Sequence, residues 1–191
     1  PAFEGSSKGV HGDSRVYTWD DLHQRAKHLL QVYKQPALVE EFIPGAEVTV
    51  GVIGNDPPRV VGVMQVVPQQ GLDDTFMYTL EVKRNWRQMV FYHCPPQLPA
   101  ACVQEIENAA ITLFRALGCR DVARLDFRID GNGCVYFLEA NPLPGLGDYS
   151  DLPIMTALAG WDYSRLLETI LNSALERYGL LLPRHAYSTS L

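Results

Sequence analysis

Charged and amide side chains interrupt an otherwise apolar stretch of the sequence, RLDFRIDGNGCVYFLEANPLPG at residues 124–145. Carboxylate and amide oxygens are the hard ligands that magnesium prefers. Whether they can meet depends on the turn between them. Asn132-Gly133 is the strongest short signal for a β-hairpin, because both residues tolerate the positive φ of a two-residue type I′ turn. The stretch is therefore predicted to form two antiparallel strands that this turn joins.

The two-residue turn places Asp126 opposite Glu139, and Arg124 opposite Asn141, on one face of the hairpin. On the other face, the expected pairs are Leu125 with Ala140, Phe127 with Leu138, and Ile129 with Tyr136. Carboxylates directly across a ladder have β carbons only about 4.5 to 5.5 Å apart, and they repel unless a positive charge lies between them. A bound cation is the expected resolution.

Magnesium suits this arrangement, because it is usually held by one or two carboxylates together with substrate phosphates. Asp126 and Glu139 would supply the carboxylates, and Asn141 would add a neutral oxygen. Calcium is less favoured because no D-x-[DN]-x-[DN]-G loop is present, and zinc because the cluster holds no His or Cys. The alternative is that the two acids face solvent, neutralised by Arg124 and Arg128.

The composition excludes several classes of partner. The 191 residues are 47% hydrophobic, enough for a real core, and the formal net charge is -6 with both signs interspersed. No basic stripe for nucleic acid and no polybasic segment for a membrane is present. The longest apolar stretches are far shorter than the roughly 20 residues of a membrane-spanning helix. We therefore expect a soluble protein with no nucleic-acid or membrane partner.

The cysteines and the first residue bear on cellular context. Four cysteines are scattered without C-x-x-C pairs, namely Cys94, Cys102, Cys119 and Cys134. This pattern favours reduced thiols in a cytoplasmic enzyme over a disulfide framework or a zinc site.

The chain begins at Pro1 without a Met, so we expect it to be a piece of a longer protein.

Periodicity and turn signals predict the elements that position these residues. Helices are expected from Thr18 to before Pro36, over 99–117 with Gly118 at the C′ position, from Ser150 or Asp151 to Gly160, and from Ser164 onward. Strands are expected at 37–43, 47–54, 59–67 and 76–83, in addition to the hairpin. This order predicts an α+β fold of mostly antiparallel sheets flanked by helices.

Five blocks make the sequence resemble the ATP-grasp superfamily, and within it the D-alanine:D-alanine ligases. They are EGSSKGV at 4–10, VEEFIPGAEVTVGVIGN at 39–55, LEVK at 80–83, ARLDFRIDGNGCVYFLEANPLPGL at 123–146 and YSDLP at 149–153. The resemblance implies an ATP-grasp fold. Residues 1–45 would end its central subdomain, and residues 46–191 would form its C-terminal catalytic subdomain. The N-terminal domain of the full ligase would lie outside this chain.

The resemblance also implies a role for individual residues. For the nucleotide, Glu40 would accept from the adenine amine, backbone groups of Glu41, Phe42 and Ile43 would read the ring edge, and Glu47 would bond the ribose hydroxyls. Ser6 and Ser7 would close over the phosphates, Ser6 also over the first amino acid. Lys83 would meet a phosphate or carboxylate, and Arg124 with the Gly145 backbone N–H would stabilise developing charge. Asp126, Glu139 and Asn141 would hold magnesium, and Ser150 would anchor the second amino acid, a role compatible with an N-cap.

The implied function is ATP- and magnesium-dependent joining of two amino acids through an acyl phosphate, with D-alanyl-D-alanine for peptidoglycan as the first candidate product. Arg84 stands where the family commonly has an aromatic residue, so another amino acid, a hydroxy acid or a peptide stays open as substrate. A non-catalytic nucleotide-binding module is the alternative from a different class. The isolated chain is expected to be weakly active or inactive, and any homodimer would form through the missing part.

Overall fold

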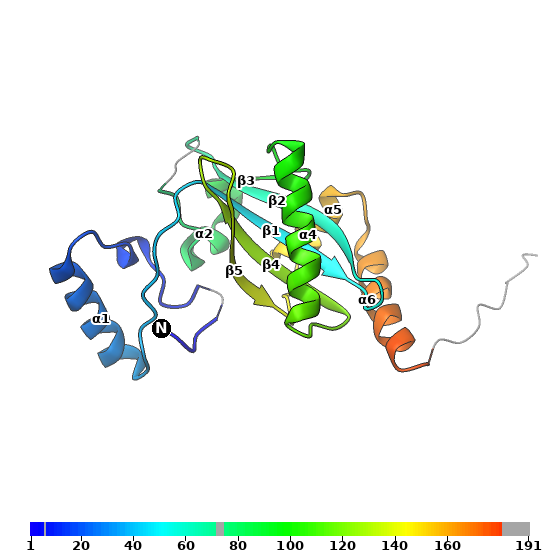
Figure 1. The fold of residues 1–191 in the computed structure, drawn as a ribbon, viewed down its shortest axis with the longest axis horizontal. Helices are drawn as coiled ribbons and strands as arrows, with labels where there is room; N and C mark the ends of the chain where they lie inside the picture. The colour runs from blue at the N-terminus through cyan, green and yellow to red at the C-terminus, as the bar shows by residue number, and fades with distance from the viewer. Residues whose placement is uncertain (6, 72–74, 181–191) are drawn as a thin grey trace, which may run out of the picture.

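A five-stranded antiparallel sheet with helices on both faces forms the body of the protein (Figure 1). The computed structural model describes residues 1–5, 7–71 and 75–180. The strands are β1 (Ala46–Ile53), β2 (Arg59–Pro68), β3 (Val90–His93), β4 (Val122–Ile129) and β5 (Val135–Asn141), in the order β3-β2-β1-β4-β5. The helices are α1 (Trp19–Tyr33), α2 (Leu80–Arg84), α3 (Trp86–Met89), α4 (Ala100–Ala116), α5 (Asp151–Leu158) and α6 (Tyr163–Arg177), preceded by a 3₁₀ turn at Gly12–Ser14. No helix in these described ranges is long and apolar enough to cross a membrane.

The two faces of the central strand pair differ in chemistry because side chains alternate along a strand. Val48, Val50, Leu125 and Phe127 are fully buried in the core on one face. Helix α4 crosses that face in Figure 1, and its residues Cys102, Ile106, Ala110 and Phe114 are buried at a spacing of four. The opposite face of β1 and β4 carries the polar residues. The main apolar core therefore supports the sheet from behind that polar face.

The hairpin turn differs from the two-residue turn that the sequence predicted. Asp130 N–H donates to Cys134 O at 3.1 Å, so the loop holds three residues, and Gly133 N–H donates to Asp130 O at 3.0 Å. Only Gly133 of this loop has a positive φ, at 85°. The Asp130 carboxylate explains the change, because its Oδ1 accepts from the N–H groups of Asn132 and Cys134, both at 2.9 Å. An aspartate that bonds the backbone ahead of it favours this wider turn.

The wider turn shifts the pairing next to it by one residue, and a bulge then reverses the shift. Phe127 pairs with Phe137 and Ile129 with Val135, so the predicted partners Leu138 and Tyr136 were wrong. The register changes between Asp126 and Phe127, where the partner strand has one extra residue. Beyond that bulge the pairs are Asp126 with Glu139, Leu125 with Ala140 and Arg124 with Asn141. The predicted pairing of the polar residues is thus confirmed, although the turn was wrong.

Two predicted strands are absent from the described chain. Residues 37–43 form no strand pairs, and Leu38 and Val39 remain exposed. Within 76–83, α2 begins at Leu80 because the Thr79 hydroxyl accepts from Val82 N–H and caps the helix. The short strand β3 was not predicted.

The predicted helices are confirmed, with small changes at their ends. Thr18 caps α1 by accepting from Asp21 N–H at 3.1 Å, and Gly118 follows α4 with a φ of 69°. Helix α6 begins at Tyr163 rather than Ser164, because the Asp162 carboxylate accepts from Arg165 N–H at 2.7 Å. The division into subdomains at residue 45 stays a prediction, although α1 lies to one side of the sheet in Figure 1.

A pair of glycines lets α5 pack directly against the polar side of the sheet. Gly51 on β1 is paired with Gly62 on β2. A β carbon at Gly62 would lie 2.5 Å from Met155 Cγ, and one at Gly51 would lie 2.7 Å from Leu152 Cδ1. Both contacts are shorter than the van der Waals distance, so the close approach of α5 requires glycine at these positions.

Replacing Gly62 with Ala should therefore destabilise the protein, because the new methyl group overlaps a buried side chain of α5. We expect Gly62→Ala to lower the free energy of unfolding by about 1 to 3 kcal/mol, as measured by urea denaturation. Gly131→Ala is the matched control, since a β carbon there meets nothing within 4 Å. Equal stability of the two variants would contradict the packing argument.

Candidate active site

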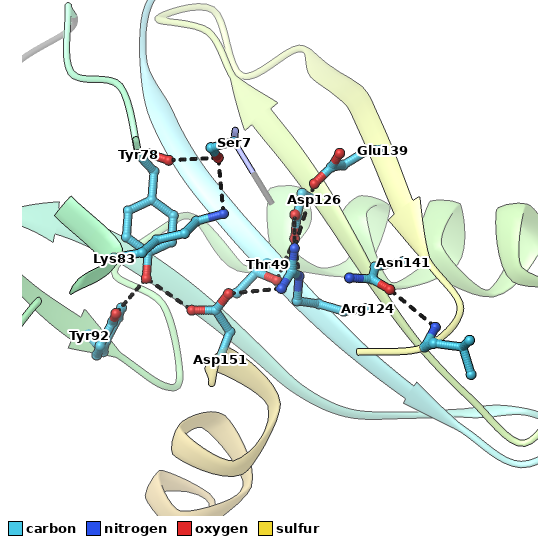
Figure 2. A network of polar contacts seen from close by, with 11 residues as sticks. Ser7, Thr49, Tyr78, Lys83, Tyr92, Arg124, Asp126, Glu139, Asn141 and Asp151 are labelled. Carbon is cyan, nitrogen blue, oxygen red and sulfur yellow. Dashed lines mark hydrogen bonds and ion pairs between the residues drawn. The ribbon is translucent and has the colours of Figure 1, made fainter. Parts of the chain in front are cut away.

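A row of polar side chains crosses three neighbouring strands on one face of the sheet (Figure 2). Thr49 on β1 is paired with Asp126 on β4, which is paired in turn with Glu139 on β5. One step along the same face, Arg124 is paired with Asn141. The structure thus brings together the four residues that the hairpin analysis selected, and it adds Thr49.

Arg124 supplies a positive charge between the two carboxylates. Its Nε and Nη2 atoms donate to Asp126 Oδ1 and Oδ2 at 3.0 and 2.8 Å, and Nη2 lies 3.6 Å from Glu139 Oε1. The Thr49 hydroxyl donates to Asp126 Oδ1 at 2.6 Å. Arg124 therefore neutralises part of the negative charge of the two carboxylates, as the alternative to a bound cation proposed. Arg128 does not, because it pairs with Glu47 at 3.0 Å.

A third carboxylate, Asp151, approaches the same guanidinium from the start of α5. Arg124 Nη1 donates to Asp151 Oδ2 at 3.1 Å. Burial raises the pKa of Asp151, although the charge of Arg124 opposes this. Partial burial and the neighbouring Asp126 raise the pKa of Glu139 as well. Burial would lower the pKa of Arg124, but Asp126 and Asp151 outweigh it and the pKa is raised, so the guanidinium stays charged.

The charges in this cluster favour a further cation. When ionised, Asp126, Glu139 and Asp151 carry three negative charges against the single positive charge of Arg124. The described residues contain no group of three or more His, Cys, Asp or Glu side chains arranged to hold a metal by themselves. Two carboxylates and an amide are nevertheless the partial set with which magnesium binds when phosphates complete its shell. The donor types and excess negative charge therefore fit magnesium.

The predicted phosphate loop and lysine lie close to this row. Lys83 Nζ donates to Ser7 Oγ at 3.3 Å and lies 4.8 Å from the centroid of the Tyr78 ring. The Ser7 hydroxyl in turn donates to the Tyr78 carbonyl at 3.3 Å. Ser7 and Lys83, far apart in the sequence, are thus in contact as shown in Figure 2. Ser6 lies outside the described residues.

The residues predicted to bind adenine and ribose line one cavity of about 540 Å³. Glu40, Glu41, Phe42, Ile43 and Glu47 all contribute to its wall, together with residues of α1 and the segment before it.

Two arginines missed by sequence reasoning also line this cavity. The guanidinium of Arg15 lies 4.0 Å, and that of Arg128 4.8 Å, from the centroid of the Phe42 ring. Arg128 is paired with Glu47 on β1, which places two opposite charges directly across the ladder, but this pairing depends on the order of the strands and leaves no local signal in the sequence.

Gly145 and Ser150, both predicted to bind the reacting groups, also lie together. A β carbon on Gly145 would lie 2.6 Å from the Ser150 hydroxyl oxygen. Ser150 occupies the N-cap position of α5, but its side chain forms no capping bond. The backbone of Ser150 therefore begins the helix, and its hydroxyl is not used for the capping that the sequence offered as a second role.

Comparison with known proteins agrees with the fold. A family model described as the D-ala D-ala ligase C-terminus matches residues 1–172. The D-alanine--D-alanine ligase of Pelotomaculum thermopropionicum is 32% identical over 177 residues, which cover 93% of this chain and 52% of that protein. The chain thus spans about half the length of the curated relatives it matches.

Two solved structures extend the comparison. The D-alanine--D-alanine ligase of Bacillus anthracis complexed with ATP matches with a TM-score of 0.67 and 22% identity, over 86% of this chain and 49% of that one. The VanG D-Ala:D-Ser ligase of Enterococcus faecalis matches with a TM-score of 0.66 and 27% identity, over 88% and 46%. The predicted fold and the family resemblance are confirmed.

The burial of Glu47 predicts how stability changes with pH. Burial raises the pKa of Glu47 to about 7, despite the attraction of Arg128, whereas an unfolded glutamate has a pKa of about 4.3. The folded protein therefore binds more protons between these values, and the free energy of unfolding falls as pH rises through that window. In Glu47→Gln this fall should be smaller, as measured by urea denaturation from about pH 5 to about pH 8. The exposed Glu105→Gln is the control, and an unchanged slope in Glu47→Gln would contradict the assignment.

Proposed function

This chain belongs to the family of the D-ala D-ala ligase C-terminus, and from that premise we propose that it is the nucleotide- and metal-binding half of an ATP-dependent carboxylate–amine ligase. The first candidate reaction is the joining of two D-alanines through an acyl phosphate. Because the chain spans about half the length of the relatives it matches, the proposal concerns the longer protein that contains it.

One observation carries the proposal: the cavity and the carboxylate row follow each other along one face of the sheet. Glu47 lines the cavity, Thr49 bonds Asp126, and Gly51 is paired with Arg124. Alternate residues of a strand are about 7 Å apart. A nucleotide with its ribose near Glu47 could therefore extend its phosphates toward Asp126 and Glu139. The reacting group would then lie near Arg124.

The residues of this face support the chemistry by positioning and charge. Lys83 and Ser7 provide an ammonium and a hydroxyl donor for phosphate oxygens, and Arg124 stabilises negative charge that develops during transfer. Asp126, Glu139 and Asn141 would hold magnesium, which neutralises phosphate charge when bound. Gly145 and Ser150 would bind the acceptor side. Such a site needs no covalent protein nucleophile.

One similar enzyme suggests a second candidate for the amine acceptor. The VanG enzyme, which matches over most of this chain, is a D-Ala:D-Ser ligase by name. Arg84, in the last turn of α2 beside Lys83, also departs from the aromatic residue common in the family. A second candidate is therefore a ligase of the same mechanism with D-serine or another amine as acceptor.

Turnover by the longer protein tests the proposal. With Mg-ATP and D-alanine, we expect phosphate release matched by dipeptide formation, and D-serine in place of one D-alanine tests the second candidate. Glu139→Gln should lower kcat/KM by about 100-fold or more, because it removes a predicted metal ligand and its charge. Calorimetry should show weaker binding of Mg-ATP by the same variant.

Glu168→Gln, an exposed change on α6, is the control and should behave as wild type. Binding of Mg-ATP without turnover of any amino acid would favour a non-catalytic nucleotide-binding module. No magnesium-dependent binding of ATP would contradict the proposal altogether.

A further inference from the structure

Asp151 is a buried carboxylate, and from the sequence we predicted only that it could begin a helix. It is 6% exposed and opens α5. Both of its oxygens are engaged: Oδ2 accepts from Arg124 Nη1 at 3.1 Å, and Oδ1 accepts from the Tyr78 hydroxyl at 3.0 Å. An acid in the first turn of a helix is often only a favourable charge near the helix dipole. Here both oxygens are directed to specific partners on other elements, as Figure 2 shows.

The two acids around Arg124 hold different edges of its guanidinium. Asp126 accepts from Nε and Nη2, and Asp151 accepts from Nη1. Because a guanidinium is planar, bonds on two edges fix its orientation as well as its position. Asp126 is also a predicted metal ligand, so its lone pairs would be shared with a cation. Asp151 belongs to α5 and not to β4, so it holds Arg124 independently of Asp126.

Tyr78 connects the same carboxylate to the segment that carries Lys83. The Tyr78 hydroxyl contacts both Asp151 and the Tyr92 hydroxyl. The Tyr78 ring faces the ammonium group of Lys83, whose own bond reaches Ser7. One carboxylate thus links α5, the arginine of β4 and the segment before α2. The proposed reaction requires that these three parts keep fixed positions relative to one another.

We propose that Asp151 is a positioning residue, which holds Arg124 in the orientation needed for transfer and ties the Lys83 segment to it. This inference rests on the proposed function for its catalytic consequence. Its structural content, the orientation of Arg124, does not depend on turnover.

The kinetic test uses the longer protein with Asp151→Asn, which keeps the shape and an acceptor oxygen but removes the charge that faces Arg124. We expect kcat to fall by about 10- to 100-fold while KM for ATP changes by less than about 3-fold, because the nucleotide cavity is not altered. Asp151→Glu, which restores the charge on a longer side chain, should recover part of kcat. The exposed Asp148→Asn on the preceding loop is the matched control and should keep the wild-type kcat.

The structural test measures hydrogen exchange of the Arg124 Nη1 hydrogens, which donate to Asp151, by NMR, with the signals assigned through Arg124→Lys. We expect exchange at least about 10-fold faster in Asp151→Asn than in wild type, with backbone amide exchange of β4 unchanged. Unchanged Nη1 exchange, or an unchanged kcat in Asp151→Asn when the wild-type enzyme turns over, would overturn the positioning role. A wild type without turnover would contradict the proposed function alone, since the exchange measurement would still decide whether Asp151 orients Arg124.

Discussion

The sharing of Arg124 among three carboxylates is the interaction on which the candidate site depends. Its side chain is one-tenth exposed, and those of Asp126 and Asp151 are similarly buried. Removing charges from water costs several kcal/mol for each ion, so such groups are tolerated only where partners are close and well oriented. One cation cannot fully compensate three anions. The cluster is therefore a place where stability is reduced in favour of a negative potential that can attract a divalent cation.

Three features of the fold keep this cluster of charges in place. The core beneath α4 supports β1 and β4 from behind. The bulge between Asp126 and Phe127 restores the register that sets Asp126 beside Glu139. The paired Gly51 and Gly62 admit α5 close to the sheet, which brings Asp151 within reach of Arg124. The charge cluster thus depends on backbone register and apolar packing as well as on its own ion pairs.

Local signals in the sequence predicted what local interactions decide. Helical periodicity and caps located α1 and α4, and strand alternation located β1 and β2. The hairpin pairing was predicted correctly at the site through two features that cancel, a wider turn set by Asp130 and a bulge beyond it. Residues 37–43 had the apolar pattern of a strand but find no neighbouring strand in the described chain. A strand needs a partner, which composition alone does not supply.

The contacts of Asp151 and Thr49 could not be read from the sequence for a related reason. Thr49 reaches Asp126 across 77 positions, and Arg124 reaches Asp151 across 27, so neither contact leaves a periodic trace. Such contacts exist only once the sheet order is known. Family resemblance supplied roles for the motif residues but gave none for these two.

The two walls of the cavity lined by Phe42 and Glu47 differ in how much of each is buried against the rest of the protein. Glu47 and Arg128 belong to a sheet whose core is closed by α4, whereas α1, on the other wall, has no fully buried residue. A ligand that contacts both walls binds more tightly when the walls are together than when they are apart. Its binding free energy therefore stabilises the closed arrangement of the two walls. Ordering of the wall that carries α1 would then accompany binding of such a ligand. The bond from Lys83 to Ser7 joins the segment before α1 to α2, which packs against β2 and β3, at the point where phosphates are proposed to lie.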